Sequence, residues 1–224
     1  MGKLTFYGQA CFSAEHGNFS LIFDPYLSEN PAQVVSPDQV HPNYILVSHG
    51  HGDHLGDTVS LALDNGAAVI TTAEMGHFLK NKAEKIQVEP MHIGGSWKFP
   101  FGRVKLTPAL HGAGVPGGVA CGFLVELGGT VIYFAGDTAL FSDMSLIGRN
   151  RRIDYALLPI GDRFTMGPED GAEAAALLNA RNVIPMHYNG NARTRQDPHR
   201  FRTLVEARCG SNVIIMTPGE TLEF

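Results

Sequence analysis

The feature that most constrains this chain is the segment His-Gly-His-Gly-Asp-His at positions 49–54, which places three histidines and an aspartate within six residues. It directly follows the apolar run Ile-Leu-Val at positions 45–47. We therefore predict that the segment begins where a buried strand ends and a loop starts. A cluster of histidines beside a hydrophobic strand has no packing purpose, so it predicts a site rather than an ordinary polar turn.

The residue types of this segment favour metal binding. Alternate side chains of an extended segment point the same way, so His49 and His51 could bind one cation together. The Asp and the last His, turning into a helix, could then face a second cation. We expect Gly50 and Gly52 to let the backbone lie close to a metal. Imidazole and carboxylate suit Zn²⁺, Fe²⁺, Mn²⁺ or Ni²⁺, and no nearby thiolate demands zinc.

Three further side chains of metal-ligand type also follow apolar runs that are typical of strands. They are His111 after 104–107, Asp137 after 131–134, and His187 after 183–186. A single His or Asp at a strand end is more often a turn or capping residue, but the joint pattern predicts one site at a sheet edge. The other histidines lack this context, and we interpret them as surface residues or as neighbours of the site: His16, His41, His77, His92 and His199.

The order of the predicted elements indicates the fold class. Short β-rich runs are predicted at Lys3–Tyr7, Cys11–His16, Ser20–Phe23, Tyr44–Ser48, Val69–Thr72, Lys85–Val88, Ser96–Phe99, Arg103–Thr107, Cys121–Leu127, Thr130–Phe134, Tyr155–Leu158, Val183–Met186, Val213–Met216 and Thr221–Phe224. Helices are predicted at Leu55–Asn65, Glu74–Asn81, Pro168–Asn179 and Pro198–Arg208. Four prolines make 24–42 an extended loop. Two packed β-sheets with helices outside fit this order best.

Length, charge and cysteine content narrow the class of protein. A chain of 224 residues is long enough for one sizeable core and short for two, so we predict a single domain over residues 1–224. Its net charge of -5, with no basic cluster longer than that at 149–152, disfavours nucleic-acid binding. The three cysteines lie far apart, which is typical of a reducing compartment. With no signal-peptide pattern and no membrane-length apolar run, the expected location is cytoplasmic.

These motifs together resemble the metallo-β-lactamase superfamily, and most closely its small, uncharacterised metal-dependent hydrolases of bacteria and archaea. The matching segments cover nearly the whole chain: Ile45–Asp57, His92–Ser96, Phe101–Ala109, Ala135–Thr138, Leu158–Asp162, Met186–Tyr188 and Pro218–Glu220. A distantly similar group with a described activity is the ascorbate-6-phosphate lactonases. The resemblance implies an α/β (α+β) fold, a four-layer αββα sandwich of two mixed β-sheets with helices on the outer faces.

The resemblance also implies a two-metal site along one sheet edge. By motif position the first metal would be held by His49, His51 and His111, and the second by Asp53, His54 and His187, with Asp137 bridging both. Two divalent metal ions are expected as cofactors, Zn²⁺ first and Mn²⁺, Fe²⁺ or Ni²⁺ as alternatives. Asp53 and Asp137 are the expected catalytic carboxylates. A hydroxide formed from water between the two cations would attack the substrate.

This chain departs from its relatives at two positions. Gln9 follows Gly8 where relatives usually have His, and Phe134 stands where they often have His. Neither position is among the seven expected ligands, so these differences bear on substrate recognition and proton transfer rather than on metal binding. The loop after His111 is also short.

The predicted function is hydrolysis of a small anionic ester, lactone or phosphoester, with a metal-dependent RNA or DNA nuclease of the same fold as the alternative. The acidic charge favours the small-molecule substrate and predicts no nucleic-acid or membrane partner; a homo-oligomer is left open. Asp24 is either a partner of a metal ligand or a turn residue. Arg193 and Arg195 either anchor an anionic group of the substrate or form a solvated loop.

Overall fold

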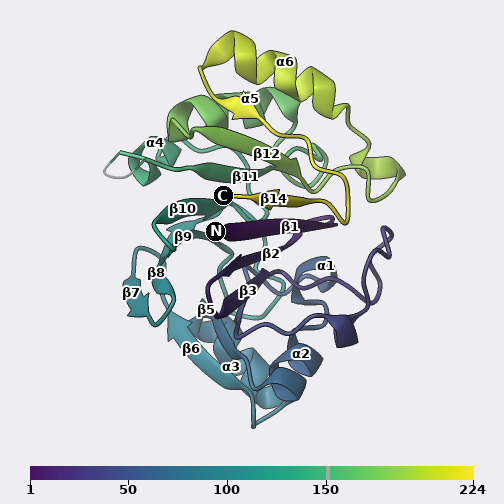
Figure 1. Ribbon diagram of the computed structural model, residues 1–224, viewed down its shortest axis with the longest axis vertical. Helices are drawn as coiled ribbons and strands as arrows, with labels where there is room; N and C mark the ends of the chain where they lie inside the picture. The colour runs from purple at the N-terminus through teal and green to yellow at the C-terminus, as the bar shows by residue number, and fades with distance from the viewer. Residues whose placement is uncertain (150–151) are drawn as a thin grey trace.

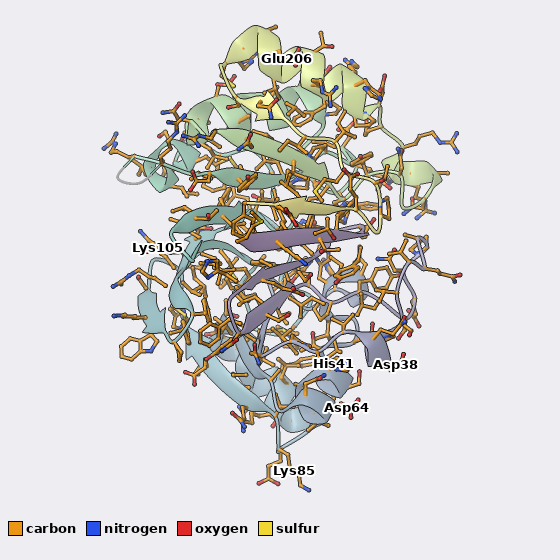
Figure 2. All side chains as sticks on the ribbon, viewed as in Figure 1. Asp38, His41, Asp64, Lys85, Lys105 and Glu206 are labelled. Carbon is orange, nitrogen blue, oxygen red and sulfur yellow. The ribbon has the colours of Figure 1, made fainter. Side chains whose placement is uncertain are left out.

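The computed structural model describes residues 1–149 and 152–224, and it consists of two β-sheets packed face to face with helices outside (Figure 1). Each sheet has seven strands. The labelled charged and polar residues at the periphery, such as Lys85 and Glu206, are exposed (Figure 2). No helix in the described part of the chain is long and apolar enough to cross a membrane. The layered arrangement agrees with the αββα sandwich and the α+β class expected from the sequence.

The first sheet is built almost entirely from the N-terminal half of the chain. Its strands, in spatial order, are β14 (Thr221–Glu223), β1 (Gly2–Gly8), β2 (Cys11–His16), β3 (Phe19–Phe23), β4 (Tyr44–Leu46), β5 (Ala68–Thr72) and β6 (Gln87–Met91). The pairings from β14 to β3 are antiparallel and those from β3 to β6 are parallel. Parallel strands need crossover segments; α2 (Thr58–Asn65) and α3 (Ala73–Lys82) supply those from β4 to β5 and from β5 to β6, and a loop connects β3 to β4.

The second sheet repeats this plan in the C-terminal half. Its strands, in spatial order, are β13 (Asn212–Val213), β12 (Asn182–Met186), β11 (Tyr155–Pro159), β10 (Thr130–Phe134), β9 (Cys121–Leu127), β8 (Gly102–Pro108) and β7 (Ser96–Phe99). The strands from β7 to β10 are antiparallel, and those from β10 to β13 are parallel. The helices of this half are α4 (Met144–Ile147), α5 (Pro168–Leu178) and α6 (Pro198–Arg208).

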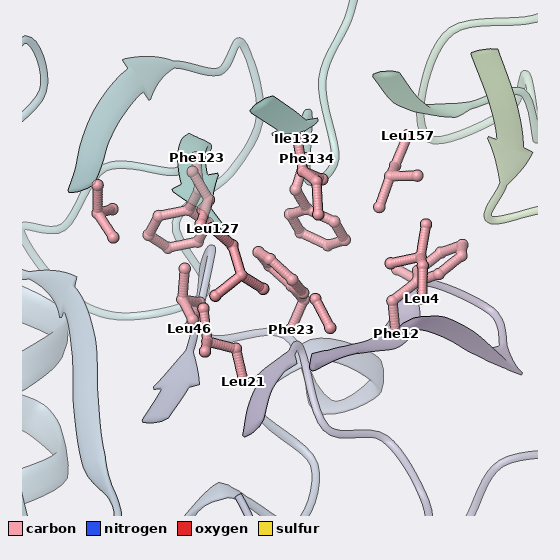
Figure 3. Packing of buried hydrophobic residues seen from close by; sticks show 14 of the residues in the cluster. Leu4, Phe12, Leu21, Phe23, Leu46, Phe123, Leu127, Ile132, Phe134 and Leu157 are labelled. Atoms are coloured by element: carbon pink, nitrogen blue, oxygen red, sulfur yellow. The ribbon is translucent and has the colours of Figure 1, made fainter. Parts of the chain in front are cut away.

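The main core fills the space between the two sheets (Figure 3). Strand β10 shows how the sequence builds it, because its side chains alternate between the two faces of the sheet. Ile132 and Phe134 pack between the sheets, whereas Val131 and Tyr133 pack under the outer helices. Both faces of this strand are therefore apolar, as expected for a strand covered on both sides.

Tertiary contacts change two elements that the sequence predicts as continuous. The helix expected at Leu55–Asn65 is split into α1 (Gly52–Leu55) and α2, because Gly56 leaves the helical conformation with φ of 37°. A Cβ at Gly56 would lie 2.3 Å from the carbonyl oxygen of Pro25, so the approach of that loop ends the helix. The strand expected at Val213–Met216 ends at Val213, since the chain then crosses to the first sheet to form β14.

The structure also contains short elements that the sequence pattern does not predict. The loop over 24–42 contains a 3₁₀ helix at Pro37–Gln39, and a second one lies at Ala192–Thr194. Helix α4 was not predicted because it has only four residues. The strand expected at Lys85–Val88 is shifted to Gln87–Met91.

Candidate metal centre

The residues singled out from the sequence meet at one edge of the sandwich, where strands of both sheets end. The segment 49–54 follows β4 of the first sheet. The other three residues come from the second sheet: His111 follows β8, Asp137 follows β10 and His187 follows β12. The two sheets are joined beside this edge, since the Cys121 backbone N–H donates to the Ser48 carbonyl oxygen at 3.1 Å. The strand-end placement that motivated the prediction therefore brings the seven side chains together.

Three histidines form the first group of the cluster. His49 Nε2 lies 2.9 Å from His51 Nδ1, and His111 Nε2 lies 3.3 Å from the same His51 atom. His49 is buried, His111 is half-buried and His51 is exposed. One ligand-type atom from each lies within 4.8 Å of the others, so this group could hold a metal ion. The group faces solvent through His51.

Asp53, His54 and His187 form the second group, which satisfies the same 4.8 Å criterion. Asp53 Oδ2 lies 3.4 Å from His187 Nε2 and 3.7 Å from His54 Nε2. Both imidazoles are buried, whereas the Asp53 side chain is 36% exposed. Asp53 is thus the member of this group that solvent can reach.

Asp137 lies between the two groups. Its Oδ2 atom is 3.2 Å from His187 Nε2 and 3.3 Å from His54 Nε2 in the second group, and 3.6 Å from His111 Nε2 in the first. The residue is only 3% exposed. A single carboxylate oxygen of Asp137 therefore lies within 3.6 Å of histidine nitrogens from both groups.

Several polar atoms of the cluster have no hydrogen-bond partner among the described residues although they are buried. They include His54 Nε2 and Asp137 Oδ1. An unsatisfied buried polar atom is costly, on the order of 1–3 kcal/mol. Because these atoms belong to imidazole and carboxylate groups, their donor chemistry fits a bound divalent cation of the zinc or iron type.

Asp24 orients one histidine of the cluster, His54. It is fully buried after β3 and accepts hydrogen bonds from the Ser48 backbone N–H at 2.7 Å and the Ser48 hydroxyl at 2.6 Å. His54 Nδ1 lies 2.6 Å from Asp24 Oδ2. A carboxylate can only accept here, so Nδ1 carries a proton and Nε2 is the His54 nitrogen that faces the cluster. Asp24 is therefore a partner of a cluster histidine, not merely a turn residue.

Gln9 is a contact that the sequence reasoning did not identify. Its Nε2 donates to Asp53 Oδ2 at 3.0 Å, and its backbone carbonyl accepts from the His187 N–H at 2.8 Å. Gln9 has φ of 55°, a left-handed conformation that is strained for a residue other than Gly, as have Asp24 and His187. The one available signal was that relatives usually carry His at this position. Ser48, which precedes the motif, was missed for lack of any signal.

Burial and close charges shift the pKa values of the cluster. Burial, reinforced by the neighbouring His54, lowers the pKa of His49 to about 2. For His54 burial acts to lower the pKa, but the Asp137 and Asp24 carboxylates outweigh it and raise the pKa well above its usual value. Burial alone would raise the pKa of Asp137, but His54 and His187 hold it below its usual range. These shifts favour an ionised Asp137 beside a protonated His54, whereas burial raises the pKa of Asp24.

The two glycines of the motif differ in their surroundings. A Cβ at Gly50 would lie 2.6 Å from Val115 Cγ1 and 3.2 Å from the Gly114 carbonyl carbon, whereas a Cβ at Gly52 would meet nothing within 4 Å. The loop that follows His111 therefore requires a glycine at position 50. The close approach of both glycines to a metal stays a prediction; the neighbour observed at Gly50 is the protein itself.

The remaining candidates lie outside the cluster. Arg193 and Arg195, in and after the second 3₁₀ helix, are exposed. Phe134 packs in the core between the sheets, stacked on Phe23. His16 ends β2, beside Gly128. Of the basic stretch 149–152, positions 150 and 151 lie outside the described residues.

Comparisons with known proteins show the family of this chain. A family model described as "Beta-lactamase superfamily domain" matches residues 20–188, which contain all seven residues of the cluster. A UPF0173 metal-dependent hydrolase from Desulforamulus reducens is 48% identical over 231 residues, covering 99% of each chain. Another from Natranaerobius thermophilus is 43% identical over 221 residues, again covering 99% of each chain.

A solved structure is also similar over the whole chain. It is that of Igni18, a metallo hydrolase from the hyperthermophilic archaeon Ignicoccus hospitalis. The TM-score is 0.91 at 33% sequence identity, and the alignment covers 100% of this chain and 99% of the other. The chain therefore shares its fold with proteins described as metal-dependent hydrolases.

Proposed function

The chain belongs to the beta-lactamase superfamily, among its metal-dependent hydrolases, and from this premise we propose that it hydrolyses a small molecule at a centre of two divalent cations. The observation that carries the proposal is the position of Asp137, whose Oδ2 atom lies within 3.6 Å of histidine nitrogens from both groups. A carboxylate between two sets of imidazoles is the arrangement that two neighbouring cations need.

The spacing of the second group would let its nitrogen and oxygen atoms hold one cation such as Zn²⁺. Ligand atoms placed tetrahedrally at about 2.0–2.1 Å from zinc are about 3.3–3.4 Å from one another. The distances that link the nitrogens of His54 and His187 to the oxygens of Asp53 and Asp137 run from 3.2 to 3.7 Å. In this assignment His49, His51 and His111 hold the other cation. None of the seven described side chains of the cluster is a thiolate, which leaves Mn²⁺, Fe²⁺ and Ni²⁺ as alternatives to Zn²⁺.

The chemistry is divided between the cations and the residues. When bound, a pair of divalent cations supplies Lewis acidity and makes hydroxide available near neutral pH. Asp24 keeps the proton of His54 on Nδ1, which leaves Nε2 as a ligand. Asp137, which is buried, fixes the spacing of the two groups. Asp53 is the carboxylate that solvent can reach, and we assign to it the orientation of water at the centre.

The proposed substrate is a small ester, lactone or phosphoester that carries negative charge. Cations in the cluster would give a positive potential where the reacting group binds. The net charge of -5 would oppose a polynucleotide, whose binding depends on many phosphate contacts. A nuclease is therefore the contrasting outcome of the test below.

The test compares Asp137→Ala with His16→Ala. We expect Asp137→Ala to lower the bound metal, measured by plasma mass spectrometry, and to reduce kcat/KM on a lactone or phosphodiester by about a thousandfold or more, because both cations lose a shared ligand. His16→Ala should retain metal and activity, since His16 lies outside the cluster. Full activity of Asp137→Ala would refute the two-metal proposal. Cleavage of structured RNA at moderate salt, without turnover of any small molecule, would replace the hydrolase by the nuclease.

A further inference from the structure

A cavity of about 430 Å³ lies beside the cluster, between the turn after β1, the loop at 30–32, the loop after β12 and the segment 215–218. These segments converge on the side of the molecule toward which the β1 arrow points (Figure 1). The volume falls within the range of ligand pockets, roughly 300–1,000 Å³. None of the described residues that line it is charged, and Phe6, Tyr188, Ile215 and Met216 are among its apolar and aromatic lining residues.

Three polar side chains in the wall have partners within the protein, whereas Gln9 Oε1 is buried without a hydrogen-bond partner among the described residues. Asn30, which is 3% exposed, donates to the Tyr26 carbonyl oxygen at 2.8 Å and accepts from the Ala32 N–H at 3.0 Å. Asn189 accepts from the Gln196 N–H at 2.9 Å. The Thr217 hydroxyl donates to a Glu220 carboxylate oxygen at 3.0 Å. Because these groups are engaged, the cavity offers a ligand mainly apolar surface.

Gln9 joins this cavity to the cluster. Its side chain lines the cavity, and its amide nitrogen donates to Asp53 at 3.0 Å. The amide oxygen of Gln9 packs against Gly190, where an added Cβ would lie 2.3 Å from it. Tyr188, which follows His187 directly, forms part of the same wall. A group bound in the cavity would therefore be separated from Asp53 by a single side chain.

We propose that this cavity binds an uncharged, apolar substituent of the substrate, such as an aryl or alkyl chain, while the hydrolysable group lies at the cluster. The inference rests on the proposed function only in calling the ligand a substrate. The negative charge of the substrate then belongs to the reacting group, which faces the cluster, and not to the end held in the cavity. Substrates with an apolar tail should be preferred to equally charged ones without a tail.

The test measures binding without catalysis. The probes are neutral 3-phenylpropan-1-ol and its anionic counterpart 3-phenylpropanoate, titrated by calorimetry into metal-free protein. Ala32→Phe narrows the cavity and Ile215→Ala widens it, while Ala83→Phe adds the same ring at the end of α3, away from the cavity. We expect saturable binding of the alcohol with a negative heat-capacity change, weakened about tenfold or more by Ala32→Phe and unchanged by Ala83→Phe. Thermal unfolding of each variant shows that it is folded.

Each outcome bears on the proposal. Tighter binding of a bulkier alcohol to Ile215→Ala than to the parent protein would support it. No saturable binding of the alcohol, or equal binding by the parent protein and a folded Ala32→Phe variant, would refute it, as would a preference for the carboxylate in metal-free protein. Hydrolysis is scored separately, so alcohol binding without any hydrolytic activity would refute the proposed function alone.

Discussion

Single residues outside the seven expected ligands determine how those ligands point. Asp24 accepts from both Ser48 donors and faces His54 Nδ1, so it selects the tautomer of a buried histidine. Gln9 orients the Asp53 carboxylate through one hydrogen bond, which its side-chain amide donates. Outer contacts of this kind typically change metal affinity by about 10–100-fold when they are removed.

Asp24→Asn is expected to weaken metal binding by about 10–100-fold, measured by competition with a chelator. Asparagine has the same shape but one oxygen and one NH₂ group. Whichever way the amide turns, its NH₂ faces a donor, either the Ser48 N–H or His54 Nδ1. Turned toward His54, it favours a proton on Nε2, the atom that faces the cluster.

Asp57→Asn is the matched control for that measurement. Asp57 accepts from the Leu27 and Ser28 backbone N–H groups, both at 2.9 Å, and is not part of the cluster. We expect it to lower stability while leaving metal affinity close to that of the parent protein. Unchanged affinity in Asp24→Asn would mean that the orientation of His54 does not depend on the carboxylate.

Residue type and position along the chain predict some residues of the site and not others. The types and strand-end positions of His111, Asp137 and His187 sufficed to place them beside the motif. Gln9 could not be placed in this way, because an uncharged amide in a turn has no ligand chemistry of its own. Its contact with Asp53 depends on how the turn after β1 packs against the loop after β12, and local sequence does not encode that packing.

At the level of elements, the sheet edge and the loop after β8 together shape the motif. The Gly50 N–H donates to the Ala113 carbonyl oxygen at 2.8 Å, so the loop is hydrogen-bonded directly to the segment between His49 and His51. Periodicity predicts the strands that deliver the ligands well. It predicts their ends less well, as the split helix at Gly56 and the short β13 show, since contacts from distant loops set those ends.

Gly50→Ala and Gly52→Ala are expected to differ sharply although they lie two residues apart. The new methyl at position 50 would press on Val115, so we expect a loss of about 1–3 kcal/mol in the free energy of unfolding and a lower metal content. At position 52, the first residue of α1, alanine meets nothing within 4 Å and should be neutral or stabilising by up to about 1 kcal/mol. Urea unfolding and metal analysis measure both. Equal effects of the two substitutions would contradict this account.

Considered as a whole, the molecule is two similar halves with a cluster at their shared edge. The segment 49–54 follows a strand of the first sheet, and His111, Asp137 and His187 follow strands of the second. The sandwich could be predicted from the repeated blocks of strands before helices. The return of the last strand to the first sheet, beside β1, could not, because three residues of β14 carry no pattern that names their partner.

Removing the metal should therefore lower the thermal stability of the whole protein. A ligand that binds only the folded state at a free concentration of about 1,000 Kd stabilises it by about 4 kcal/mol. For a chain of this size that corresponds to a rise in Tm on the order of 10 °C. We expect added Zn²⁺ to raise the Tm of chelator-treated protein by this amount in a calorimetric scan. Asp137→Ala should show a much smaller rise, and an equal rise in both proteins would indicate binding elsewhere.

The pairing of β14 with β1 brings the two ends of the chain together (Figure 1). Gly2 and Phe224 exchange backbone hydrogen bonds at 2.7 and 3.0 Å. The cluster lies beyond the other end of β1, past Gly8, so a strand of seven residues, roughly 20 Å, separates it from both ends. A fusion partner or a surface tether attached at either terminus would consequently leave from the same place and hold the protein with its reactive edge turned away from the attachment.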